Sequence, residues 1–323
     1  MSGFLHAYLV AWLFVLGISL GALANRMVLS LTGGQWARPV EPAWQAASAS
    51  LPMVALLFLP LALGVRLVWP LTEEPGAWLN VPFFLVRSVA YLALWCLLAW
   101  GHAGARDEAA ARRWSAAGLI AYAVSVSLAA VDWIASLMPS WYSSGFGLLV
   151  GTGQMLSAAA FGVAATAARL DDDERTRRSF HDLGNLLLMY VLTWAYLAYT
   201  QFAIIWSENL PREIAWYVPR MQTGWAAVGV AVVVLHFAVP FAILLSRRAK
   251  RSPRFLARLA AGLVVMHGVQ VAWLVLPSVR PGGFALAWSD PLAILAVLAA
   301  WGWCWRRAMR RAGHAPSKEW AHG

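Results

Sequence analysis

One carboxylate and two arginines lie inside apolar stretches of this 323-residue sequence. Arg66, Arg87 and Asp132 belong to three different stretches. Each lies near the end of its stretch that faces the same side when successive stretches run in opposite directions. At a rise of 1.5 Å per residue, Arg87 and Asp132 lie about 10 Å and about 8 Å from that end. Charges at such positions are costly unless they pair. We expect Asp132 to pair with Arg87, with Arg66 nearby, either as a structural ion pair or as a binding or proton-transfer site.

Two histidines occupy the middle of later apolar stretches. His236 is followed in the next stretch by His267, and Gln270 lies one helical turn beyond His267. Neutral imidazoles can relay protons, and two histidines on facing helices can ligate a b-type haem. The two residues differ in depth by roughly 5 Å and form the only such pair, which argues against haem. A histidine with a structural hydrogen bond is the alternative for each.

A further polar group opens the stretch that begins at Ser179. His181 and Asp182 follow it closely, and either Ser179 or Asp182 can cap the first turn of a helix. The alternative is a proton path. His181 and Asp182 would then lie at one mouth, the two mid-depth histidines in the centre, and Asp132 near the other surface.

The composition identifies the surroundings of these groups as a membrane. Hydrophobic residues make up 61% and charged residues 12% of the chain, with a mean hydropathy of +0.62, which excludes a water-soluble globule. Cys96 and Cys304 lie in separate apolar stretches, so the sequence supports neither a disulfide framework nor a thiolate metal site. It also lacks a phosphate-binding glycine loop, a haem attachment motif and a cysteine cluster for iron and sulfur. We predict no metal site and no covalently bound cofactor.

The apolar stretches predict about nine transmembrane helices, because open backbone is not satisfied in hydrocarbon and no alternating strand pattern is present. Their approximate bounds are 4–24, 51–70, 80–101, 114–137, 144–168, 181–206, 220–246, 254–276 and 287–305. The predicted fold is an all-α, polytopic membrane helix bundle. Residues 1–310 form a single integral membrane domain, and residues 311–323 form a short tail. The first stretch is too long, and has no preceding basic residue, for a signal peptide.

The basic residues sort to one side of this arrangement. Twenty of the 25 fall in one set of connections, which begins with Arg26 and Arg38, whereas the opposite set holds Arg212, Arg220 and Arg280. Positive charge favours the cytoplasmic side, so the N-terminus is expected outside and the C-terminus in the cytoplasm. The net charge of +10 then reflects topology and contact with anionic lipid headgroups rather than nucleic acid.

Several segments resemble the F subunit of alternative complex III, a bacterial quinol:cytochrome c oxidoreductase. Residues 80–87 (NVPFFLVR) with 91–95, and residues 132–143 (DWIASLMPSWYS), resemble two of its motifs, the second written DWxxSLxPxW(F/Y)S. Further similar segments are 181–185, 194–196, 201–202, 204–211, 236–237, 240–241, 244–247 and 273–277. These segments occur in the family's order and extend over nearly the whole chain.

The resemblance implies a relative of the NrfD-type membrane subunits, whose helices form two four-helix bundles, in the bacterial cytoplasmic membrane. Implied partners are an NrfD-like sister membrane subunit that holds the quinol, an iron–sulfur protein, c-type cytochromes and a terminal oxidase. The polar positions that it assigns to a proton path are Arg87, Asp132, His181, Asp182 and His236. This chain departs from the family in having Gln270 where relatives have an acid, and nine predicted spans where larger relatives have ten.

The leading hypothesis is therefore a membrane subunit that anchors a quinol-oxidising respiratory complex and conducts protons through Asp132, Arg87, His236, His181, Asp182 and His267. A second hypothesis is a quinone site of its own, formed by Arg87, Asp132, Arg66 and Trp133. A third is a secondary transporter, against which we count the lack of an evident inverted repeat or of helices broken at the midplane.

Overall fold

The computed structural model describes residues 2–72, 78–167, 173–280, 282–283 and 287–312. These residues are helical, and their only extended pairing is an isolated bridge between Thr72 and Asn80. Eight of the described helices are long and apolar enough to cross a membrane. The chain is therefore an all-α, multi-pass membrane helix bundle.

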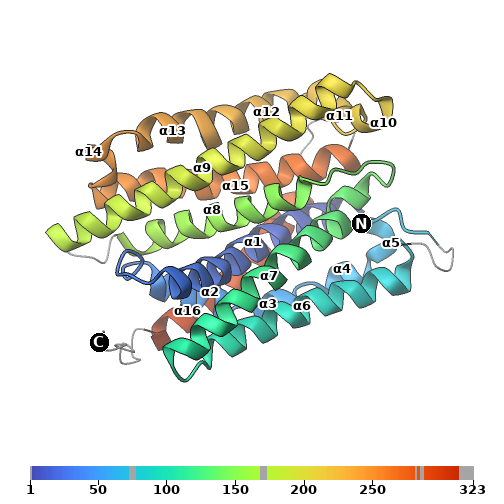
Figure 1. Ribbon diagram of the computed structural model, residues 1–323. Coiled ribbons are helices and arrows are strands. Elements are labelled where there is room, and N and C mark those ends of the chain that lie inside the picture. Colours follow the sequence, from blue (N-terminus) through green and yellow to red (C-terminus); the bar gives the residue numbers. More distant parts are fainter. Residues whose placement is uncertain (1, 73–77, 168–172, 281, 284–286, 313–323) are drawn as a thin grey trace.

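One group of four spans occupies the lower half of Figure 1. It consists of α1 (Ser2–Thr32), a second span divided into α2 (Glu41–Ala49), α3 (Leu51–Leu56), α4 (Leu59–Leu63) and α5 (Val65–Val68), α6 (Val81–Ala103), and α7 (Glu108–Trp133) with the short η1 (Ala135–Leu137). Pro52 and Pro60 stand in the first turns of α3 and α4, where a missing N–H removes no hydrogen bond. Prolines therefore divide this span without breaking its direction.

The other group of four spans lies above it in Figure 1. It consists of α8 (Phe146–Thr166), α9 (Glu174–Glu208), a divided span of α12 (Trp225–Val232), η3 (Val233–Ala238) and α13 (Val239–Leu244), and α15 (Pro253–Val279). The connections contain α10 (Pro211–Ile214), α11 (Val218–Met221) and α14 (Arg247–Lys250). The turn η3 is a π-helix. Pro240 follows it, and a proline inside a helix cannot donate to the carbonyl four residues earlier.

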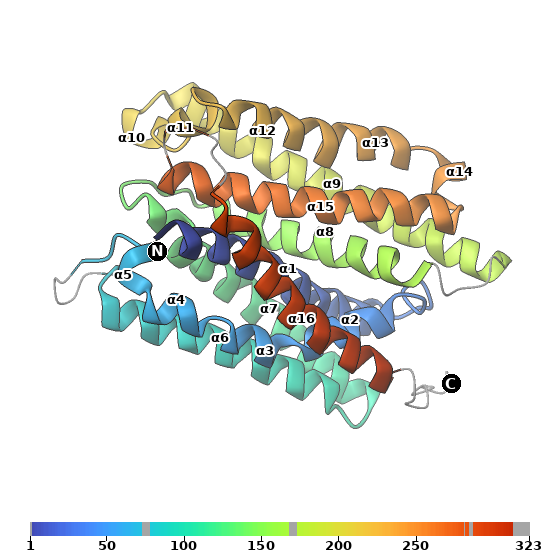
Figure 2. The same cartoon turned by 180° about the vertical axis from the view of Figure 1, so that it is seen from behind.

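A further long helix, α16 (Ser289–Ala312), crosses in front of α1 and α2 in the view of Figure 2. The indole Nε1 of Trp301 donates to Ser19 Oγ at 2.8 Å, which attaches α16 to the middle of α1. The basic last turn of α16 contains Arg310 and Arg311, and the helix is not among the eight apolar spans. It corresponds to the predicted segment 287–305.

The first helix forms the centre of the molecule. It packs against α2, α7, α8, α15 and α16, and nearly all of its residues are buried. Gly21 makes the closest approach: a Cβ at this position would overlap the main-chain oxygen of Gln154 on α8. Nearby, Asn25 Nδ2 donates to Met155 O at 2.9 Å. Small residues let the backbones of membrane helices pack closely, and here they allow the two groups of four spans to pack together.

Exposed aromatic residues mark two levels along the helices. Trp206, Trp288 and Tyr142 are exposed at the end of the bundle where α10 lies, and Trp100 is exposed at the opposite end of α6. Phe83 and Trp100 on α6 are separated by about 25 Å along the helix axis. This distance is close to the thickness of the hydrocarbon core, and aromatic belts are expected at its two surfaces.

The structure corrects two expectations about the first connection. Residues 25–50 were expected to link the first two spans, but α1 continues to Thr32 and the second span begins at Glu41. Arg26, expected in a basic loop, is instead buried inside α1 and donates from Nη1 to Ser48 Oγ on α2 at 3.0 Å. The α2 segment is helical because Trp44 is buried and donates from Nε1 to Ala158 O of α8 at 2.8 Å.

Candidate functional site

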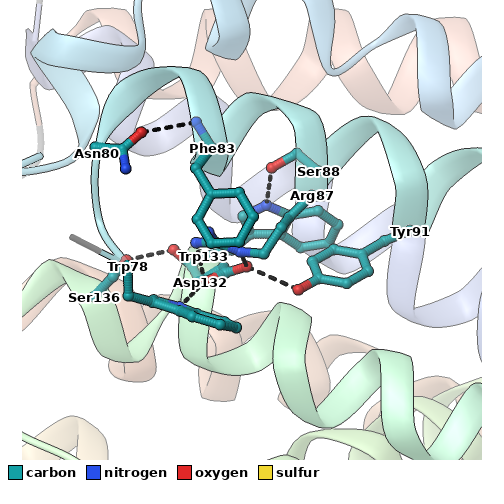
Figure 3. A network of polar contacts seen from close by, with 9 residues as sticks. All are labelled: Trp78, Asn80, Phe83, Arg87, Ser88, Tyr91, Asp132, Trp133 and Ser136. Carbon is teal, nitrogen blue, oxygen red and sulfur yellow. Dashed lines mark hydrogen bonds and ion pairs between the residues drawn. The ribbon is translucent and has the colours of Figure 1, made fainter. Parts of the chain in front are cut away.

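The expected ion pair is present at the end of α6 and α7. Arg87 Nε donates to Asp132 Oδ2 at 2.8 Å, and Arg87 Nη2 donates to Asp132 Oδ1 at 2.8 Å (Figure 3). Asp132 is fully buried, and Arg87 is almost so. Two parallel N–H···O bonds form the strongest geometry available to a guanidinium and a carboxylate. The equal depths of the two residues in the sequence therefore predicted a real contact.

Two aromatic side chains complete the coordination of this carboxylate. Trp78 Nε1 donates to Asp132 Oδ1 at 2.8 Å, and the Tyr91 hydroxyl donates to Oδ2 at 2.9 Å. Each oxygen thus accepts two hydrogen bonds, which uses the full capacity of a carboxylate. Rings also cover the guanidinium, because Arg87 Cζ lies 4.1 Å from the ring centre of Trp78 and 4.3 Å from that of Phe83.

Local sequence explains why these side chains meet. Asn80 caps α6 by accepting from Phe83 N at 2.9 Å, and Pro82 occupies the first turn, so the start of α6 is fixed. Arg87 then lies about two turns inside the helix. On the other side, α7 ends at Trp133, and the Ser136 hydroxyl donates to the main-chain oxygen of Asp132. These contacts thus hold Asp132 and Arg87 at the same level along the bundle.

This arrangement leaves the carboxylate no free lone pair. It accepts four hydrogen bonds, two of them from a guanidinium, so a further donor has no acceptor left on Asp132. The geometry therefore suits a structural clamp between α6 and α7 better than a group that exchanges protons. One guanidinium nitrogen, Arg87 Nη1, is buried without a hydrogen-bond partner in the described part of the chain.

The other two residues of the expected quinone site have different surroundings. Trp133 is buried among aromatic rings, with its ring centre 4.8 Å from that of Trp12, and its Nε1 donates to Ser88 Oγ at 3.0 Å. Arg66 is exposed on α5. Among the described residues, Arg87, Trp78 and Tyr91 are the side chains that donate hydrogen bonds to Asp132. Trp78 and Tyr91, absent from the expected site, take the places that Arg66 and Trp133 were expected to hold.

The mid-depth histidines belong to the other group of helices. His236 lies within the π-turn η3, with its ring centre 4.8 Å from Trp194 of α9 in an edge-on arrangement. Pro240 lies four residues beyond His236, so the His236 carbonyl has lost its regular helical donor. Neither ring nitrogen of His236 has a hydrogen-bond partner among the described residues. A π-turn at such a residue is frequent at functional sites.

His267 lies deeper in the interface between the two groups. A Cβ on Gly17 of α1 would come within 2.9 Å of His267 Nε2, so the imidazole is directed at the α1 backbone. Both nitrogens of His267, and Oε1 of Gln270, also have no hydrogen-bond partner among the residues described. Unsatisfied buried polar atoms are costly, and buried water usually satisfies them. The two histidines therefore provide polar positions that can hold water inside the second group.

His181 and Asp182 lie about two turns inside α9, where further polar residues join them. His181 Nδ1 lies 3.6 Å from Asp182 Oδ1 and 3.4 Å from Asn185 Nδ2. Lys250 of α14 is buried and donates from Nζ to Asn185 Oδ1 at 2.7 Å. Neither Ser179 nor Asp182 is the cap of this helix, because α9 begins one to two turns earlier, at Glu174.

Arg220 was expected in a loop between spans. It is fully buried on α11, donates to Trp216 O at 2.6 Å and to Leu274 O at 2.7 Å, and stacks 3.4 Å from the Trp216 ring centre. Burial lowers the pKa of the Arg220 guanidinium to about 9, which leaves it charged at neutral pH. Leu274 lies three residues before Pro277, a proline inside α15, so Arg220 supplies a donor at this turn of the helix.

A second bidentate pair fixes the starts of α1 and α16. Arg280 donates to Asp290 Oδ2 at 2.6 Å and to Oδ1 at 2.9 Å, and also to Gly3 O at 2.9 Å. Hydrogen bonds to Asp290 raise the pKa of Arg280. This pair was not predicted, although an arginine and an acid ten residues apart, at the ends of two successive apolar stretches, provide a usable signal.

The residues expected for one proton path therefore form separate sets. Asp132 and Arg87 lie between α6 and α7, whereas His236 and His267 lie in the second group, and His181 and Asp182 lie near the start of α9. Among the described residues no group of three metal-ligating side chains comes together. No protein-family model matches the sequence, and no curated protein is significantly similar to it.

Proposed function

We propose that this chain is an integral membrane subunit of a quinol-oxidising respiratory complex of the alternative complex III type, which it anchors in the membrane. Its partners in this proposal are an NrfD-like sister membrane subunit, an iron–sulfur protein, c-type cytochromes and a terminal oxidase. The observation that carries the proposal is that the segments of resemblance, far apart in the sequence, make contact with one another in the fold.

Two contacts illustrate this convergence. Segment 80–87 meets segment 132–143 through the pair of Arg87 and Asp132. Segment 194–196 meets segment 236–237 through the edge-on contact of Trp194 with His236, whose ring centres lie 4.8 Å apart. Motifs that occur in order and also pack together are what a shared scaffold requires, and this supports the family assignment over chance similarity.

The proposal includes nine crossings of the bacterial cytoplasmic membrane. The ninth is α16, whose 24 residues extend for about 36 Å and which packs along the central helix. With nine crossings, the basic turn at Arg310 and Arg311 lies in the cytoplasm and the start of α1 lies outside. The start of α1 and the end of α16 lie at opposite ends of the bundle in Figure 2.

Any proton conduction by this subunit is assigned to the second group of helices. Its support is the set of unpartnered nitrogens on His236 and His267, together with the polar cytoplasmic group of Lys250 and Asn185. Between these lies the Tyr190 hydroxyl, which donates to Asn25 Oδ1 at 2.6 Å. The saturated Asp132 acts as a clamp in this scheme. His267→Phe is expected to lower the number of protons released per electron, and Asp132→Asn, once assembled, is not.

A quinone site beside the ion pair is the second candidate. It is favoured by the unpartnered Nη1 of Arg87, a donor suited to a quinone carbonyl, and by Trp78, which covers the pair and is 46% exposed. Quinone retained by the purified chain, displaced by a quinol analogue and lost in Arg87→Gln, would establish this site. Retention that is unchanged in Arg87→Gln would reject it.

The subunit role is tested by identifying what purifies with the chain. A tagged chain, extracted in mild detergent, is expected to bring down an iron–sulfur protein and a multihaem c-type cytochrome in constant proportion through two purification steps. Haem absorbance and the metal content of the fraction provide independent readouts. A chain that remains folded and monodisperse but free of redox subunits would contradict the proposal and favour transport, for which the π-turn in the seventh span is the structural argument.

A further inference from the structure

Two tyrosines face outward from the middle of α9. Tyr196 is 67% exposed and Tyr199 is 70% exposed. The outer end of this helix is marked by Trp206, which is 73% exposed. Tyr196 lies ten residues before it, which corresponds to about 15 Å, or half the thickness of a hydrocarbon core. Tyr199 lies about 10 Å below Trp206. Both rings are therefore placed well inside the membrane rather than at its surface.

The other tyrosines show that this position is unusual. The sequence has eight tyrosines. Five of them, Tyr8, Tyr91, Tyr122, Tyr190 and Tyr217, form hydrogen bonds through their hydroxyl groups inside the bundle. Tyr142 lies in an outer connection, where water is available, and stacks with Arg212. Only Tyr196 and Tyr199 combine membrane depth with a hydroxyl that has no hydrogen-bond partner in the described structure.

These hydroxyls do not reach water by bending along the helix. Side chains on a helix lean toward its N-terminus, and α9 begins at the cytoplasmic end, so both rings lean away from the nearer, outer surface. Lipid tails offer no hydrogen-bond acceptor, and an unsatisfied hydroxyl in hydrocarbon is costly. Tyrosine is otherwise found at membrane surfaces, where its hydroxyl is wet. The occupant of this face must therefore provide oxygen acceptors at mid-membrane.

The residues around the two tyrosines form a stripe typical of helix contact. Its polar or small members recur largely at intervals of three and four residues, and the exposed apolar Met189 and Leu192 lie among them. The polar or small members are Asn185, Thr193, Tyr196, Tyr199, Thr200, Ala203 and Ser207. Every member is exposed or half-buried. Hydroxyl-bearing and small residues at this spacing are used for packing between membrane helices. A helix that only met lipid would carry aliphatic side chains at the positions of the two tyrosines, as α7 does at Ile120, which is 70% exposed.

We infer that this α9 stripe is an intersubunit surface covered by a transmembrane helix of a different protein, which has small residues opposite the two tyrosines and a polar oxygen acceptor at their depth. Two large rings protrude from the stripe, so a complementary helix must be small there. A second copy related by a two-fold axis would instead bring Tyr196 against Tyr196, because an isologous contact matches each patch with itself. The inference rests on the subunit role proposed above.

Photocrosslinking in native membranes tests the occupant directly. A benzophenone-bearing amino acid replaces Tyr196 in one variant and Ile120 in a matched control of similar exposure. We expect irradiation at position 196 to give at least tenfold more protein adduct than at position 120. Mass spectrometry of the adduct should map it to an apolar helix of another polypeptide that contains a serine, threonine, asparagine, glutamine or acidic residue. Adducts with lipid alone, or with a second copy of this chain, would overturn the inference.

The hydroxyl groups are tested separately by the double variant Tyr196→Phe with Tyr199→Phe. Neither hydroxyl forms a hydrogen bond within the described structure. The purified chain alone should therefore keep its thermal stability, while the fraction recovered with its partner falls about tenfold. Tyr142→Phe is the control and should change neither quantity. Undiminished recovery would refute the role of the hydroxyls. A mapped helix belonging to a complex without redox subunits would leave this surface assigned and would reject only the respiratory role.

Discussion

Replacement of Asp132 by asparagine isolates the electrostatic part of the clamp between α6 and α7. The change keeps the size of the side chain and one of its oxygens. It removes the negative charge opposite Arg87, and it places an amide N–H group where two donors, either Arg87 Nε and Tyr91 or Arg87 Nη2 and Trp78, now point. The guanidinium remains buried, with rings on two sides, and has no other carboxylate within bonding distance among the described residues.

The expected cost follows from this geometry. Removing one partner of a buried ion pair costs about 3–5 kcal/mol, because the other charge is left uncompensated. This corresponds to a decrease of roughly 10²–10⁴-fold in the ratio of folded to unfolded protein. Removing both charges, in Arg87→Met with Asp132→Leu, is expected to restore most of the loss, since replacing a whole buried pair with apolar residues is often nearly neutral.

The assay is reversible unfolding of the purified chain in mixed micelles, with the helical signal followed as denaturing detergent is added. Tyr91→Phe serves as an intermediate case, because it removes one hydrogen bond to the carboxylate, worth about 1.5–3 kcal/mol, and no charge. The predicted order of stability is wild type, Tyr91→Phe, then Asp132→Asn. An Asp132→Asn variant as stable as wild type, or a double variant no better than the single one, would show that the pair is not a clamp.

Three further substitutions probe other contacts. Gly21→Ala is expected to force α1 from α8, at about 1–3 kcal/mol, and to reduce the monodisperse fraction in size-exclusion chromatography, whereas Gly302→Ala, which faces open space, should have no effect. Arg220→Met leaves the carbonyls of Trp216 and Leu274 without this donor and should cost about 1–3 kcal/mol in the same unfolding assay. Arg280→Met releases the start of α1 from α16, so limited proteolysis should cleave the N-terminal turn sooner than in wild type, and equal rates would contradict this.

Hydropathy and depth predicted the helices and the contact between Arg87 and Asp132 because both depend on distance along regular helices. The other donors to Asp132 differ in how visible they were. Tyr91 lies one turn beyond Arg87, so helical spacing contains the information needed to find it. Trp78 comes from a connection, where no period relates sequence position to depth. Charge and depth thus predict the pair of Arg87 and Asp132 but not the Trp78 side chain that covers it.

Two arginines were predicted wrongly for a shared physical reason. Counting positive charge by side treats each arginine near a span end as a loop residue. Arg26 lies in a helix that extends beyond the membrane-length window and is buried there. Arg220 is buried against α15 and donates to Leu274 O. Both satisfy polar groups of neighbouring helices, and such tertiary contacts leave no trace in local hydropathy.

The π-turn in the seventh span was not predicted. Pro240 was visible in the sequence, and a proline four residues after His236 weakens the helix there. Whether the helix then kinks, or widens into the π-turn observed at Val233–Ala238, depends on how it packs against α9 and α15. The span continues through this turn from Trp225 to Leu244, and His236 inside the turn has no hydrogen-bond partner for its ring nitrogens among the described residues.

The position of α1 at the centre has a consequence for biosynthesis. This helix is made before the other described helices, yet its neighbours include α15 and α16, and its Ser19 accepts a hydrogen bond from Trp301, 282 residues later. Until those helices are inserted, α1 must remain in the bilayer with its glycines and polar side chains facing lipid. Interrupted translation should therefore leave a fragment vulnerable to membrane quality-control proteases, because the later helices α15 and α16 are needed to cover α1.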